Sequence, residues 1–291
     1  MREVKLKIAT ISMKRKGGCN QPEADQRVQA LKWLLEEPSE KYDLIATSSS
    51  YFESEEQLYE FVKCFKKLPE NKTSILLAIY DGKGSKNKNN MSGKEDGNYS
   101  GNDGVYFLNP DRGAKLIAAQ KFHLAAMYNA NRDEFINDVK NERFPKSVAS
   151  TLLGGLRVAA LSCGEINAFE TNGTVKGGNI TVRARDECVG KLFDSADLVY
   201  NPTHDRMGQY NRLNPKREYL SREIEGRVRC YISVSNWDVC KQYQNREDTY
   251  AQTSNASTLH TVYVRGVSQN LNSVKALCND DFECREVKVK F

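Results

Sequence analysis

The sequence has no long apolar run, which argues against a membrane-spanning protein. None of its apolar stretches approaches the roughly 18 consecutive residues that a transmembrane helix needs. Its first residues, MREVKLKIATISM, alternate charged and apolar side chains as a strand does, without the apolar core or cleavage site of a signal peptide. We therefore expect a cytoplasmic protein that does not contact a membrane.

Metal-binding patterns are scarce as well. The chain has three histidines in 291 residues, and its eight cysteines include no CxxC pair. Zinc sites usually take their ligands from such clusters, so we expect no metal and no other cofactor. In a reducing compartment most of the thiols are expected to be small buried hydrophobes.

The sequence has no long stretch in which charges of one sign are concentrated. The chain has 43 Lys and Arg against 38 Asp and Glu, a net charge of +5. Basic clusters at 13–18 and 63–72 are short, whereas a nucleic-acid-binding face has a denser basic stripe with aromatic platforms. We interpret these clusters as solvated surface and do not expect direct contact with nucleic acid.

What the sequence does contain is an alternation of strand and helix patterns. Its first part predicts strands over 4–13, 42–52 and 73–82 and amphipathic helices over 22–38 and 55–68. This β-α-β-α-β order favours an α/β protein. The continuously apolar third strand is typical of a strand buried on both faces.

The rest of the chain continues this alternation after a polar interruption. Residues 82–104 are rich in Gly, Ser, Asn and Lys and predict a surface insertion. Beyond them we expect a hairpin over 105–124, a charged segment, helical or irregular, over 127–148, helices over 182–196 and 215–228, and strands at 156–163, 197–203, 230–236, 257–266 and 283–291. No linker divides the chain, so we expect one domain over 1–291.

Reactive and polar side chains stand where several of these strands end, and ligand sites of α/β proteins gather beyond the carboxyl ends of strands. A cysteine, Cys163, and a lysine, Lys121, are among them. They suit thiol acyl transfer, in which a thiolate attacks an electrophilic carbon and an ammonium lowers the thiol pKa and stabilises the oxyanion. Each local string taken alone also fits a buried structural thiol and an exposed lysine.

The order of four short motifs resembles the nitrilase, or carbon–nitrogen hydrolase, superfamily. KFHL (121–124) is similar to the segment that carries that family's catalytic lysine, and LSCGE (161–165) to the segment that carries its nucleophilic cysteine. ADLVYNP (196–202) and ISVSN (232–236) match later landmarks. The resemblance spans nearly the whole chain, although each motif is weak by itself.

The resemblance implies a four-layer α-β-β-α sandwich, a homo-oligomer, and Cys163 and Lys121 as nucleophile and catalytic lysine. The family often has a second acidic residue between them, for which Glu134 is the candidate here, although an exposed helix charge is the alternative. Glu165 is interpreted as an ion-pair partner that fixes the turn after Cys163. The expected substrate pocket comprises Ser49, Glu165, Asn201, His204 and Asn236.

The chain departs from the family where the first catalytic glutamate is expected. Aligning DLIATSS (43–49) on the family's strand puts Ser49 at that position, and a serine hydroxyl is no general base at neutral pH. Glu53 and Glu55 are close in sequence, but they begin the next helix and would have to fold back into the pocket.

Two functions therefore stay open. The first is a cysteine-dependent hydrolase or acyl transferase acting on a linear, amide-type C–N bond of a small molecule. The second is a catalytically impaired module of the same fold, used for ligand binding, regulation or assembly with a protein or nucleoprotein partner.

Overall fold

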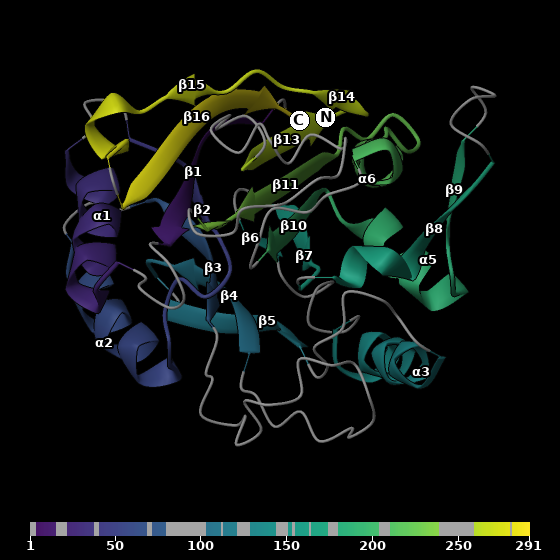
Figure 1. Cartoon of the computed structure of the whole chain (residues 1–291), viewed down its shortest axis with the longest axis horizontal. Coiled ribbons are helices and arrows are strands. Elements are labelled where there is room, and N and C mark those ends of the chain that lie inside the picture. The colour runs from purple at the N-terminus through teal and green to yellow at the C-terminus, as the bar shows by residue number, and fades with distance from the viewer. Residues whose placement is uncertain are drawn as a thin grey trace.

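The structure is a computed structural model, and it describes residues 4–15, 22–37, 41–68, 72–79, 103–111, 113–120, 129–143, 151–152, 155–162, 164–173, 180–203, 210–238, 259–279 and 281–291. Two β-sheets pack face to face, and helices cover the outer face of each (Figure 1). The predicted α-β-β-α sandwich is confirmed.

The first sheet has three parallel strands at its centre and antiparallel strands on both sides. In space its order is β15-β16-β1-β2-β3-β4-β5, and β12 also pairs with β1. The strands are β1 (Lys5–Arg15), β2 (Leu44–Thr47), β3 (Ser74–Ile79), β4 (Asp103–Asn109), β5 (Gly113–Gln120), β12 (Trp237–Asp238), β15 (Asn272–Ser273) and β16 (Phe282–Lys290).

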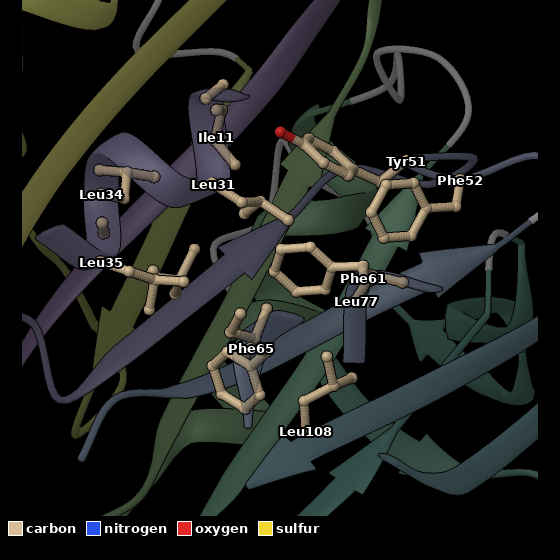
Figure 2. Packing of buried hydrophobic residues seen from close by; sticks show 14 of the residues in the cluster. Ile11, Leu31, Leu34, Leu35, Tyr51, Phe52, Phe61, Phe65, Leu77 and Leu108 are labelled. Carbon is tan, nitrogen blue, oxygen red and sulfur yellow. The ribbon is translucent and has the colours of Figure 1, made fainter. Parts of the chain in front are cut away.

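Helices α1 (Ala24–Glu36) and α2 (Glu55–Phe65) cover the outer face of this sheet. Their apolar stripes meet the strand residues that point outward, as Figure 2 shows for Leu31, Phe61 and Phe65 against Leu77. Strand side chains alternate between the two faces. Ile11 of β1 therefore packs under the helices, whereas its neighbours in sequence face the second sheet.

The second sheet runs in the order β14-β13-β11-β10-β7-β6. Its strands are β6 (Thr151–Leu152), β7 (Leu156–Ala160), β10 (Leu198–Thr203), β11 (Cys230–Ser235), β13 (His260–Val264) and β14 (Val267–Ser268). Strands β7, β10 and β11 are parallel. The outer face packs against α3 (Asn129–Asp138), continued by a π-helical turn over Val139–Arg143, and against α5 (Glu187–Ser195) and α6 (Tyr210–Ser221).

The space between the sheets is apolar at one end and polar at the other. Leu6 and Ile8 of β1 belong to the apolar cluster between the sheets, but the next residues on the same face are Thr10 and Ser12, which are fully buried. Buried hydroxyls need hydrogen-bond partners, and both find them across the gap, at His260 and at the carbonyl of Ser235. The polar end lies at the carboxyl ends of the parallel strands.

Three predicted elements have different bounds. Strand β2 ends at Thr47, before the serines that were included in strand 42–52. The predicted helix 182–196 begins as strand β9 (Thr181–Ala184), which pairs with β8 (Phe169–Asn172), and α5 starts only after its N-cap residue Asp186. Alternating exposed and half-buried side chains at 181–184 suit a strand of a two-stranded ribbon.

The helix predicted over 215–228 is also displaced. Helix α6 begins earlier, at Tyr210, and ends at Ser221. Pro215 therefore lies inside the helix rather than at its start. The predicted insertion at 82–104 lies outside the described residues except for Asp103 and Gly104, which already belong to β4.

The start of α2 offers a test of local stability. Ser54 is its N-cap residue, and its hydroxyl accepts a hydrogen bond of 3.2 Å from Gln57 N. Ser54→Ala is expected to lower the free energy of unfolding by about 1 kcal/mol, because a helical N–H loses its acceptor. Urea denaturation measures this loss, with Ser54→Asp as the control that keeps an acceptor. Equal losses in both variants would contradict the capping role.

Candidate functional site

The turn that follows β7 is the first element of the site. Position 163 lies outside the described residues, but both of its flanks are described. After Ala160 the chain leaves the strand, Gly164 adopts a left-handed conformation (φ 83°), and a 3-10 helix runs over Glu165–Ala168. Glycine reaches a positive φ without steric cost, which suits Gly164 to this turn.

Buried polar side chains hold this turn from two sides. Glu165 is 1% exposed, and its carboxylate accepts a hydrogen bond of 2.7 Å from Ser162 N. On the other side Asn201 Nδ2 donates to the carbonyls of Leu161 (2.9 Å) and Ser162 (3.1 Å). Glu165 thus binds the backbone of the turn through a hydrogen bond to a peptide group, and its predicted ion pair stays a prediction.

The turn that follows β2 is the second element. Ser48, Ser49 and Ser50 are all buried, and Ser50 has a positive φ of 57°. Such a conformation is strained for a residue other than glycine, and strained residues cluster at functional sites. The hydroxyls of Ser48 and Ser50 have no hydrogen-bond partner among the described residues, which is uncommon for buried polar groups.

Asn236 ties this second turn to the other sheet. From the end of β11 its Nδ2 donates to Ser49 O at 2.7 Å, and its Oδ1 accepts from Met13 N at 3.4 Å. One side chain therefore joins the carboxyl ends of strands from both sheets. Asn201 and Asn236 play matching parts: each is buried, and each binds the backbone of one of the two turns.

The two glutamates that follow Ser49 in the sequence bind other side chains. Glu53 forms an ion pair of 2.6 Å with Arg27 of α1 and is 55% exposed. Glu55, the first residue of α2, accepts a hydrogen bond from the Tyr106 hydroxyl. Arg27 also donates to Tyr51 O at 2.9 Å, which fixes the residue after the strained serine.

A buried histidine lies farther along the polar seam between the sheets. His260 Nδ1 is 2.8 Å from Thr10 Oγ1, and His260 Nε2 has no hydrogen-bond partner within the described residues. Burial, with a smaller contribution from the Arg285 guanidinium, lowers the pKa of His260 to about 3. The imidazole is therefore neutral at physiological pH.

The structure brings four of the predicted site residues to the two turns: Ser49, Glu165, Asn201 and Asn236. Lys121, Cys163 and His204 lie outside the described residues, and Glu134 belongs to α3. Sequence reasoning missed Arg27, Tyr231 and His260, which support the site from positions distant in the sequence. A charged or polar residue within an otherwise apolar helix face or strand was the available signal for each.

No group of three His, Cys, Asp or Glu side chains in the described segments is placed to hold a metal ion. Nor does any described helix combine the length and apolar character that crossing a bilayer requires.

Comparison with known proteins finds resemblance in structure alone. No protein-family model and no curated protein sequence matches the chain. It is similar to a CN-hydrolase superfamily protein from Xanthomonas campestris, solved with an arsenic adduct in its active site (10% identity, 99% of this chain and 90% of that one, TM-score 0.45).

Two further solved structures have comparable scores. One is a mutant amidase from Nesterenkonia sp. AN1 with the acetamide moiety of fluoroacetamide on its active-site cysteine (9% identity, 97% and 90% of the two chains, TM-score 0.46). The other is a carbon–nitrogen hydrolase from Helicobacter pylori G27 (7% identity, 98% and 88%, TM-score 0.45). Likenesses at this level of sequence identity and TM-score assign no function.

Proposed function

We propose that the chain is a cysteine-dependent hydrolase or acyl transferase that acts on a linear, amide-type C–N bond. One observation carries the proposal: the backbone just before position 163 is held by buried hydrogen bonds, which Asn201 Nδ2 donates to the carbonyls of Leu161 and Ser162 and which the Glu165 carboxylate accepts from Ser162 N. Two buried polar side chains are thus committed to the peptide groups of this one turn. Such support suits a residue that must be held in one orientation for chemistry.

In the proposed reaction the Cys163 thiolate attacks the carbonyl carbon of the substrate, and Lys121 stabilises the oxyanion. The C–N bond then breaks, and the amine leaves with the proton that the thiol gave up. Water, or another acceptor in a transferase, attacks the resulting thioester, releases the acyl group and restores the thiol. Glu134 is the proposed second acidic residue, and Ser49, Asn201, His204 and Asn236 are proposed to surround the substrate.

A second candidate is the catalytically impaired module that binds a ligand or a partner. It is favoured by the serine at position 49 together with the engagement of Glu53 by Arg27 and of Glu55 by Tyr106. Loss of a general base costs about 10²–10⁴-fold in rate. We further propose a single-domain, cytoplasmic homo-oligomer for both candidates.

Thiol labelling separates the two candidates. We expect iodoacetamide to modify Cys163 faster than the buried Cys230 and Cys284, whose pKa values are raised by burial. Lys121→Met is expected to slow labelling at neutral pH about tenfold, the effect of one pKa unit on the thiolate fraction. Intact-mass analysis with peptide mapping measures both.

Lys115→Met, on strand β5 just before Lys121, is the matched control and should label at the wild-type rate. The same analysis after exposure to amides and nitriles tests for an acyl adduct on Cys163. Labelling of Cys163 no faster than that of Cys230 would contradict the enzyme and favour the binding module.

A further inference from the structure

Tyr231 of β11 lies behind the turn that carries position 163. Its side chain is fully buried, and its hydroxyl donates a hydrogen bond of 3.0 Å to Asn201 Oδ1. The Nδ2 of the same amide donates to the carbonyls of Leu161 and Ser162. These four residues form a continuous network of hydrogen bonds from one strand, through the next, to the turn.

The two carbonyls of the turn decide which way the asparagine amide faces, and Tyr231 anchors its other end. An asparagine side chain can rotate by half a turn and exchange its donor and acceptor ends. Because carbonyls only accept, the nitrogen must face the two carbonyls of the turn, and the Tyr231 hydroxyl then donates to the oxygen. A reversed amide would set its oxygen against the oxygens of Leu161 and Ser162, which is repulsive.

The amide in turn sets the peptide plane that joins Ser162 to residue 163. Ser162 O accepts from Asn201 Nδ2 at 3.1 Å and from Glu165 N at 3.1 Å, so two donors fix its direction. Because a peptide group is planar, this also fixes the direction in which the chain enters position 163.

We propose that Tyr231 and Asn201 are positioning residues for the reaction at Cys163: the amide fixes the peptide that precedes the thiol, and the tyrosine anchors the amide. This inference rests on the proposed function, since it takes Cys163 as the nucleophile. Small displacements of a reacting group lower rates strongly, so loss of one hydroxyl far from the substrate has a measurable effect.

Tyr231→Phe removes only the oxygen that binds Asn201 and keeps the ring in the core. The rate of Cys163 alkylation by iodoacetamide is expected to fall about fivefold at its high-pH plateau, the factor that the net contribution of one hydrogen bond allows. The midpoint of its pH profile is expected to shift as well. Asn201→Asp, which turns the donor into an acceptor, is expected to have a larger effect in the same direction.

Tyr263→Phe is the matched control, because Tyr263 lies directly opposite Tyr231 in the β11–β13 pair and belongs to the same core cluster. A merely structural role would lower thermal stability in both tyrosine variants and leave both alkylation profiles at the wild-type position. If Cys163 is labelled in the wild type and the Tyr231→Phe profile superimposes on it, the positioning role is overturned and the proposed function stands. If Cys163 is not labelled in the native wild type, both are overturned.

Discussion

Replacing Ser49 with glutamate is expected to raise the rate of amide hydrolysis by about 10²–10⁴-fold, the typical contribution of a general base. The turn that would carry the new carboxylate is already held in place. Asn236 donates to Ser49 O, and the Arg27–Tyr51 contact fixes the residues that follow. Ser49 itself is 5% exposed, whereas both of its neighbours are 1% exposed or less. A larger side chain at 49 therefore has more room than at either neighbour.

Ser49→Gln is the matched control, because glutamine has the size of glutamate but cannot take a proton at neutral pH. Release of ammonia from a panel of small linear amides measures the rate, and intact-mass analysis detects the acyl adduct on Cys163. The variants should unfold at similar urea concentrations, so that a difference in rate reports chemistry. Equal rates of ammonia release for Ser49→Glu and Ser49→Gln would contradict the prediction that a carboxylate at position 49 acts as a general base.

The buried histidine is expected to make the protein sensitive to acid. In the unfolded chain His260 titrates near 6.5, whereas in the folded protein burial and Arg285 hold its pKa at about 3. Between these values the unfolded state binds a proton that the folded state does not bind. The free energy of unfolding therefore has its full value above about pH 6.5, as far as His260 is concerned, and falls as the pH is lowered. The loss is up to about 1.4 kcal/mol for each pH unit.

The variant His260→Asn isolates this effect, because asparagine can still bind the Thr10 hydroxyl but does not titrate. The free energy of unfolding, measured in urea at several pH values, should fall more steeply in the wild type than in the variant. The difference between the free energies of unfolding of the two proteins is expected to change by about 2.3 kcal/mol between pH 6.5 and 4.5, because His260 of the unfolded chain is already half protonated at pH 6.5. Carboxylates titrate in both proteins and cancel in the comparison. If the difference in free energy of unfolding between the wild type and the variant did not depend on pH, burial would not be preventing the protonation of His260.

The layers of this fold could be predicted from the sequence because they depend on periodic patterns. The alternation of strand and helix patterns up to residue 82 placed β1, α1, α2 and β3 within three residues of their bounds, whereas the strand predicted for β2 ran five residues too far. The prediction failed where the secondary structure that a segment prefers locally differs from the one that its pairing partner imposes. Residues 181–184 resemble the start of the helix that follows them, but pairing with β8 makes them a strand.

Only part of the site could be predicted for a related reason. Ser49, Asn201 and Asn236 were singled out because they lie at or near the carboxyl ends of strands, and strand ends can be located in a sequence. The groups that hold them come from elements that are distant in sequence, such as Tyr231 behind Asn201 and Met13 N beside Asn236. A contact that depends on how two sheets stack leaves no pattern of residue spacing in the sequence from which it could be predicted.

The pairing of β1 with β16 has a consequence for synthesis. Thr10 and Arg285 are direct neighbours in this pair although 275 positions separate them. Bringing such distant segments together is slow, because loop-closure entropy must be overcome before the contact stabilises anything. While the chain emerges from the ribosome, β1 must therefore present an open sheet edge to its surroundings until β16 has been made. An unpaired edge is a template for aggregation, so β1 is the strand at which an incomplete chain is most open to pairing with a second molecule.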